Sequence, residues 1–245
     1  MPSLVDKIAA KDYIADTLGP EWVIPTLWSG SRLPQELPWP APYVVKANHG
    51  CGWNIFITDS ATVDVATLQR RCQRWLGRTY GRWWGEWVYS QITPRLLVEP
   101  MLHVNGLPPL DYKVWVFHGH AVNIQVHDPA SNRDRRATDF DPSWRRQPFA
   151  GMALKPHTDD PPRPARLAAM IEAAEKLGRG FPFMRVDFYE VDGTPLVGEL
   201  TFYPTSGFSP RVPLEYDDAF GRLWRLPDGR LPWPKAMRRL TPEQP

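Results

Sequence analysis

The sequence has little cysteine, little net charge and no long apolar run, and each shortage excludes a class of protein. Two cysteines in 245 residues, Cys51 and Cys72, cannot build a disulfide framework, so we expect a reducing, cytoplasmic location. No apolar run approaches the roughly 20 residues of a membrane-spanning helix, which predicts that the chain has no membrane span. A formal net charge of +2 gives no strong attraction to nucleic acid, and no nucleic-acid partner is expected.

The composition nevertheless predicts a folded protein with many loops. Hydrophobic residues make up 42% of the chain, enough for a sizeable core, and 28 prolines limit the helix content. Apolar periodicity predicts helices over 3–18, 62–76 and 164–177. Strands are predicted over 43–46, 54–58, 95–102, 112–118, 121–127, 183–191 and 195–201. This order indicates an α+β fold with antiparallel sheets, and the polar segment 128–163 is predicted to be a long loop.

Arginines and tryptophans alternate between residues 70 and 87. Such a pattern can bind nucleic-acid strands, but the interpretation we favour is an amphipathic helix with a solvated arginine face and buried tryptophans. The histidines are scattered without the spacing of zinc ligands, so no zinc site is predicted.

A glycine-rich loop over 46–54 connects two predicted strands. Gly50 and Gly52 would let backbone N–H groups approach phosphate oxygens, and Lys46 would add a positive charge. A loop that returns as a strand differs from the loop-to-helix arrangement of nucleotide fingerprints. An ordinary hairpin with two turn glycines explains the same residues equally well.

The hairpin over 183–201 carries the strongest signal. If its connecting loop has an odd number of residues, its polar side chains project from one face of the ribbon, and we predict a three-residue loop around Asp192-Gly193. The polar side chains in question are Arg185, Asp187, Glu199 and Thr201. Two adjacent carboxylates repel unless a cation bridges them, which favours Mg²⁺ bound together with substrate phosphates. The alternative is a surface hairpin with weak ion pairs.

Together these segments resemble the ATP-grasp superfamily, and within it the TupA-like ATP-grasp proteins associated with teichuronopeptide and surface-polysaccharide biosynthesis. The resemblance extends over nearly the whole chain. It rests on the order and spacing of Tyr43-Val-Val-Lys-Ala-Asn-His-Gly50, Glu86-Trp-Val-Tyr89, Pro94-Arg-Leu-Leu-Val-Glu99, Asp111-Tyr-Lys113, Phe181-Pro-Phe-Met-Arg-Val-Asp187 and Gly198-Glu-Leu-Thr-Phe-Tyr-Pro-Thr-Ser-Gly207.

The resemblance implies two lobes that clasp ATP between antiparallel sheets, without a full preceding α/β domain. It divides the chain into an N-terminal helix and connection (1–42), a small lobe with the glycine flap (43–98), a large lobe with the metal hairpin (99–225) and a tail (226–245). It implies ATP binding by Lys7, Lys46, His49, Gly50, Gly52, Glu99, Met101 and Asp111. It implies Mg²⁺ binding by Asp187, Glu199 and Thr201, and contacts of Lys113 and Arg185 with the transferred phosphoryl group.

The chemistry implied by the resemblance is ligation of a small-molecule carboxylate to an amine through an acylphosphate. Thr201 departs from the asparagine that is common at that position, which weakens a second magnesium site. Acceptor recognition would come from the 128–163 loop, the C-terminal tail or a partner protein. A phosphotransferase, or a non-catalytic nucleotide-binding module of a polysaccharide-biosynthesis complex, remains an alternative.

Overall fold

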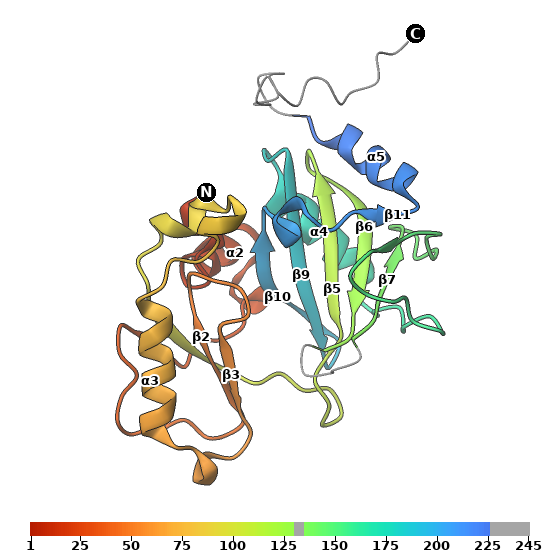
Figure 1. Ribbon diagram of the computed structural model, residues 1–245. Helices are drawn as coiled ribbons and strands as arrows, with labels where there is room; N and C mark the ends of the chain where they lie inside the picture. Colours follow the sequence, from red (N-terminus) through yellow and green to blue (C-terminus); the bar gives the residue numbers. More distant parts are fainter. Residues whose placement is uncertain (130–134, 226–245) are drawn as a thin grey trace.

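Two antiparallel sheets lie in separate lobes, as Figure 1 shows. The computed structural model describes residues 1–129 and 135–225. The small-lobe sheet has the order β1 (Trp28–Gly30), β4 (Leu96–Pro100), β2 (Tyr43–Ala47) and β3 (Asn54–Ile57). The large-lobe sheet has the order β10 (Thr194–Thr201), β9 (Phe183–Val191), β5 (Asp111–Phe117), β6 (His120–His127) and β7 (Ala137–Phe140). The predicted α+β class with antiparallel sheets is confirmed.

The small lobe is held together by one face of its sheet and helix α3 (Val65–Leu76). Val45, Leu96 and Val98 of the sheet pack with Leu68, Cys72 and Trp75 of the helix, all of them buried. The Asp64 side chain caps the helix by accepting the Thr67 N–H at 3.1 Å. Because β1 pairs with β4, this lobe includes part of the segment that the sequence assigned to the N-terminal connection.

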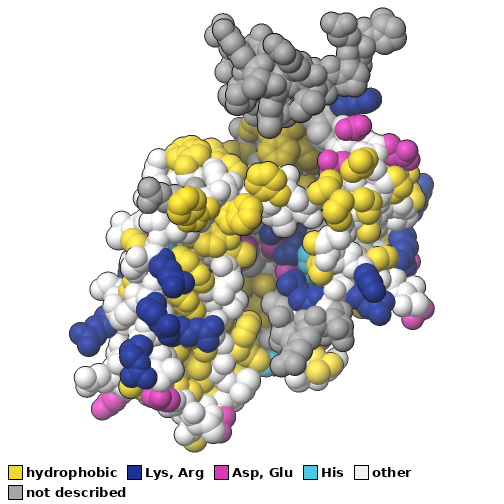
Figure 2. Space-filling view, viewed as in Figure 1, with side chains coloured by type: hydrophobic (Ala, Val, Ile, Leu, Met, Phe, Trp, Pro, Cys, Tyr) yellow, Lys and Arg dark blue, Asp and Glu magenta, His cyan; other side chains and the backbone are white. Residues whose placement is uncertain are grey.

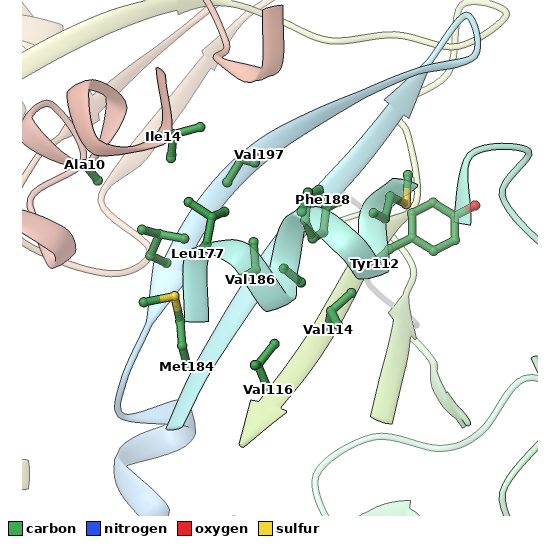
Figure 3. Close-up of a cluster of buried hydrophobic side chains, with 14 of the residues drawn as sticks. Ala10, Ile14, Tyr112, Val114, Val116, Leu177, Met184, Val186, Phe188 and Val197 are labelled. Atoms are coloured by element: carbon green, nitrogen blue, oxygen red, sulfur yellow. The ribbon is translucent and has the colours of Figure 1, made fainter. Parts of the chain in front are cut away.

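The main apolar core of the large lobe lies on one face of its sheet. Val114, Val116, Val186 and Phe188 point toward helix α4 (Leu167–Gly178), and helix α2 (Ala9–Leu18) adds Ala10 and Ile14 beside Val197 (Figure 3). Side chains alternate along a strand. The residues between these apolar positions therefore lie on the opposite face of the sheet.

The acidic hairpin reaches its predicted arrangement by a different route. Its turn has two residues, Asp192 and Gly193, both with positive φ, and Thr194 pairs directly with Val191. The predicted three-residue loop is therefore wrong, and a two-residue turn alone would separate the carboxylates. A β-bulge at Gly198 adds one residue to β10 and returns the polar side chains of both strands to one face. Glu199 therefore pairs with Asp187, and Thr201 pairs with Arg185.

The predicted helix 3–18 is interrupted where it passes the cleft. It forms α1 (Pro2–Val5) and α2, and between them the Asp6 side chain accepts the N–H groups of Ile8 and Ala9. A short acidic side chain that bonds to nearby backbone competes with helix continuation. The interruption lets the Lys7 N–H donate to the Asn48 carbonyl in the glycine loop, at 3.1 Å.

Two further expectations are corrected. The segment predicted as a loop contains β7 and β8 (Ala150–Gly151), which pairs with β11 (Arg211–Val212) ahead of α5 (Leu214–Leu223). Of the tryptophans expected to be buried, Trp75 is buried, but the three that follow it are exposed because they lie beyond the helix, in the 3-10 turns that begin at Arg82 and Trp87. They are Trp83, Trp84 and Trp87. Among the described residues, no helix is long and apolar enough to cross a membrane.

The close packing at the bulge predicts that adding a methyl group to Gly198 lowers the stability of the protein. A Cβ on Gly198 would lie 2.6 Å from the Tyr189 ring. We expect Gly198→Ala to lower the free energy of unfolding by about 1–3 kcal/mol, measured by urea denaturation, because a packed ring must move. In the matched control Gly221→Ala, on exposed α5 with nothing within 4 Å, stability should stay unchanged or rise. Equal stabilities of Gly198→Ala and the wild type would contradict this account of the bulge.

Candidate active site

The polar face of the large-lobe sheet lines a hollow between the two lobes. Basic and acidic side chains lie together in this hollow (Figure 2). Asp187 lies at the centre of this group, almost fully buried. Arg185 donates Nε to Asp187 Oδ1 at 2.6 Å and Nη2 to Oδ2 at 2.7 Å, and Lys113 Nζ donates to Oδ2 at 2.5 Å. Burial alone would raise the pKa of Asp187, but these two cations lower its pKa to about 2. Asp187 therefore stays ionised at the junction of three strands.

Glu199 connects the hairpin to the other lobe through Lys7. The Lys7 ammonium donates to Glu199 Oε1 at 2.7 Å and to the Gly50 carbonyl at 2.9 Å. Burial opposes ionisation of Glu199, yet the neighbouring ammonium of Lys7 lowers the pKa of Glu199 below its usual range. One lysine thus joins the N-terminal segment, the glycine loop and the metal hairpin that the sequence predicted.

A second buried carboxylate, Glu99, lies between two lysines. Lys46 Nζ donates to Glu99 Oε2 at 2.5 Å, and Lys11 forms an ion pair with the other carboxylate oxygen. Lys11 also donates to the Ile24 carbonyl at 2.8 Å and to Thr26 Oγ1 at 2.6 Å. The sequence analysis missed Lys11, although its spacing of four residues from Lys7 in a predicted helix would have placed both near one site.

A largely apolar cavity of about 250 Å³ lies between the two sheets. Of the residues that the resemblance assigned to ATP, four line it: Lys46, Glu99, Met101 and Asp111. Val44, Phe56 and Tyr189 supply apolar and aromatic walls. The Met101 N–H donates to the Pro42 carbonyl at 3.1 Å, so a hydrogen bond from this N–H to ATP would require that bond to open. Tyr189 was missed as a wall residue, although it follows Arg185 and Asp187 in the polar row of its strand.

The glycine loop has one residue in the cleft region and one in the lobe interior. Gly52 has φ +72°, and a methyl group added to its Cα would meet nothing within 4 Å, which is the geometry of an exposed turn. His49 is buried instead, with Nε2 3.2 Å from the Trp75 and Arg78 carbonyls. Its ring therefore holds the loop against the end of α3 and does not line the cavity.

The donor chemistry fits a magnesium ion that shares its ligands with phosphates. Asp187 and Glu199 are cross-strand neighbours, and Thr201 Oγ1 lies 3.1 Å from Arg185 Nη2 on the same face. Nearby on β5, Asp111 Oδ1 is a buried carboxylate oxygen with no hydrogen-bond partner among the described residues, and it is the oxygen available to an ATP hydroxyl, not to the metal. Within residues 1–129 and 135–225, no group of three or more His, Cys, Asp or Glu side chains could hold a metal by itself. Mg²⁺ usually takes one or two carboxylates plus substrate phosphates, which this arrangement allows.

Glu86 is a further buried acid that the sequence analysis used only as part of a motif. It accepts a hydrogen bond from Ser206 Oγ at 2.8 Å, which ties the loop before β4 to the turn after β10. Burial raises the pKa of Glu86 above its usual range. Ser206 and Thr205 both have positive φ, a strained conformation for residues other than glycine.

Comparison with known proteins gives the family of the chain and solved structures with a similar fold. A family model described as TupA-like ATPgrasp matches residues 1–225. Among solved structures, the D-alanine–D-alanine ligase of Bacillus anthracis complexed with ATP is similar at 15% identity with a TM-score of 0.51, covering 89% of this chain and 61% of the ligase. A D-cycloserine synthetase is similar at 18% identity with a TM-score of 0.49, covering 90% of this chain and 71% of the synthetase. The chain thus spans about three fifths of that D-alanine–D-alanine ligase. No curated protein sequence gives a significant match.

The charge around the site predicts a pH dependence through His127. Its Nε2 is 2.7 Å from Gln125 Oε1, and burial together with the charges of Lys113 and Arg185 lowers its pKa to about 2. In the unfolded chain His127 takes up a proton with its ordinary pKa of about 6.5, whereas in the folded chain it stays neutral. The free energy of unfolding therefore falls as the pH drops below about 6.5. We expect the wild type to lose about 2 kcal/mol more than His127→Gln between pH 7.5 and pH 5 in urea denaturation. Parallel pH profiles for the two proteins would refute a neutral, buried His127.

Proposed function

The chain belongs to the TupA-like ATP-grasp family, and from this premise we propose that it is an ATP-dependent carboxylate–amine ligase. The observation that carries the proposal is the pairing of Asp187 with Glu199 on one sheet face, beside a cavity between the lobes. A surface hairpin would leave these carboxylates in solvent. Here Asp187 is 3% exposed, and both carboxylates are met by cations from other segments.

The cavity suits the base and ribose of ATP. Its apolar walls fit a purine ring, and Asp111 at one end offers a carboxylate oxygen to a ribose hydroxyl. Lys46 would then meet the phosphates on the small-lobe side, and Lys7 would meet them below the glycine loop. The phosphate chain would run along β5 from Asp111 toward Lys113, the next residue on the same face.

Lys113 and Arg185 would neutralise the charge of the transferred phosphoryl group. Both bond to Asp187, Lys113 from the neighbouring strand β5 and Arg185 from β9 itself, so their positions are fixed before substrate arrives. Preorganised cations of this kind stabilise a developing charge without reorganisation during the reaction. A substrate carboxylate oxygen attacks the γ-phosphorus, ADP leaves, and the acylphosphate is then attacked by an amine to give the amide and phosphate.

Asp187, Glu199 and Thr201 would hold Mg²⁺, which supplies charge neutralisation to the phosphates when bound. Lys7 donates to Glu199 and to the Gly50 carbonyl, and it therefore orients this carboxylate relative to the glycine loop. The substrates are small molecules, and a role in surface-polysaccharide or peptide-conjugate biosynthesis, with a partner protein for the acceptor, follows from the family resemblance.

Reaction products test the proposal. With a panel of carboxylic acids and amines, we expect ADP and phosphate to appear only when ATP, an acid and an amine are all present, and hydroxylamine to trap the acylphosphate as a hydroxamate. Asp187→Asn should reduce ADP formation at least 100-fold, because Lys113 and Arg185 lose the carboxylate that positions them. The matched control Glu172→Gln changes an exposed carboxylate of α4 that pairs with Lys176 on the same helix, and it should keep full activity.

The other functions give different products. A phosphotransferase would form ADP and a phosphorylated acceptor without free phosphate. A non-catalytic module would bind ATP and form no ADP with any acid and amine. Either result, or equal activity of Asp187→Asn and the wild type, would overturn the ligase assignment.

A further inference from the structure

A second group of buried polar side chains lies on the same sheet face, next to the proposed phosphoryl-transfer residues. Arg211 of β11 lies over Trp115 of β5, with its guanidinium carbon 4.3 Å from the ring centre. Asp139 of β7, completely buried, is the nearest carboxylate, with 3.6 Å between Arg211 Nη2 and Asp139 Oδ1. Strand β11, which pairs with β8, and helix α5 lie beside this part of the sheet (Figure 1), and Phe149 and Phe220 also contact the Arg211 guanidinium.

Three buried donors in this group have no acceptor within the part of the chain that the structure describes: Arg211 Nε, Arg211 Nη2 and the Trp115 indole nitrogen. The Arg211 side chain is only 6% exposed. The distance to Asp139 exceeds that of a hydrogen bond. Asp139 instead accepts from Asn123 Nδ2 at 2.6 Å and Gln125 Nε2 at 3.1 Å. An unsatisfied buried donor costs about 1–3 kcal/mol, more for a charged group, so these donors indicate a site for an acceptor.

The chemistry of these donors favours an anion. A guanidinium presents planar N–H groups that match a carboxylate, and an indole N–H can only donate. The aromatic rings of Trp115, Phe149 and Phe220 surround the guanidinium and exclude water. A carboxylate bound there would meet Arg211 in a setting where the hydrogen bonds are stronger than in solvent.

The position of the group relates it to the reaction. Every second residue of β5 lies on this face, about 7 Å from the next one along the strand. In order, these residues are Asp111, Lys113 and Trp115. Asp111 lines the nucleotide cavity, Lys113 contacts Asp187, and Trp115 pairs in register with Arg185. Trp115 and Arg211 therefore lie beyond the phosphoryl-transfer residues, on the side away from the base.

We propose that Arg211 and the indole N–H of Trp115 bind a second carboxylate of the acyl substrate. This rests on the proposed ligase function and specifies its substrate class: a molecule with two acidic groups. One carboxylate faces Lys113 and Arg185 for activation, and the other is held by Arg211. Arg211 comes from β11, which follows the last strand of the large-lobe sheet, so β11, its partner strand β8 and helix α5 have a part in substrate selection.

Binding of matched acids tests this without turnover. The probes are succinate, glutarate and adipate, each compared with the monocarboxylate of equal carbon number, namely butyrate, valerate and hexanoate. They are titrated by calorimetry into the full chain with ADP and Mg²⁺. We expect at least one dicarboxylate to bind 10-fold or more tightly than its monocarboxylate partner. If no dicarboxylate has this advantage, the proposal is wrong.

The variants separate the site from the fold. Arg211→Met alone would leave Asp139 buried without its cation, so it is combined with Asp139→Asn. Trp115→Phe keeps a ring beneath the guanidinium and removes only the indole donor. Both should reduce the dicarboxylate advantage, the double variant to less than twofold, with ADP affinity unchanged. Arg222→Met, on the exposed side of α5, is the matched control and should keep the advantage.

The outcomes distinguish the two proposals. An advantage that persists in the double variant and in Trp115→Phe overturns this site. A lost advantage in variants that still bind ADP supports it, whatever the turnover assay gives. Absence of amide synthesis together with a retained dicarboxylate preference in the wild type would overturn the ligase assignment and leave the anion site in place.

Discussion

The arrangement of buried charge on one sheet face is the constraint on which the rest of the structure depends. Carboxylates with little solvent contact are costly unless cations and hydrogen bonds meet them. Asp187 is met by Arg185 and Lys113 from its own sheet, whereas Glu199 and Glu99 are met by lysines of the N-terminal segment and the small lobe. The same ion pairs therefore offset the free-energy cost of burying these carboxylates and connect the two lobes on either side of the cleft.

Much of this was predictable because local signals and the global fold agree. The seven predicted strands correspond to β2, β3, β4, β5, β6, β9 and β10 within one or two residues. The turn between β9 and β10 lies at the predicted Asp192-Gly193, although it is one residue shorter than predicted. The pairing of Asp187 with Glu199 was also predicted, from parity. The β-bulge that produces this pairing was not predicted. The bulge lies at Gly198, and because glycine has no side chain, the alternation of polar and apolar residues does not reveal it.

Other features depend on tertiary contacts that a single sequence does not encode locally. His49 belongs to the same motif as Gly50, but its ring is buried in the small lobe because it bonds to backbone carbonyls at the end of α3. Arg211 pairs with Asp139, a residue far away in the sequence, and no spacing rule connects the two. The four-residue spacing from Lys7 could have placed Lys11 near the site, but it does not predict the pairing of Lys11 with Glu99. Short strands such as β8 and β11 carry too few residues for periodicity to show.

The bulge at Gly198 also limits how the hairpin can change in length. A residue inserted into β10 between Thr194 and Gly198, with the turn unchanged, would shift the register by one residue and carry Glu199 to the apolar side against α2 and α4. Two inserted residues would return it to the cleft. Within the paired strand the ribbon should therefore tolerate insertions and deletions only in even numbers, whereas a residue added at the Asp192-Gly193 turn leaves the register and the acidic pair in place.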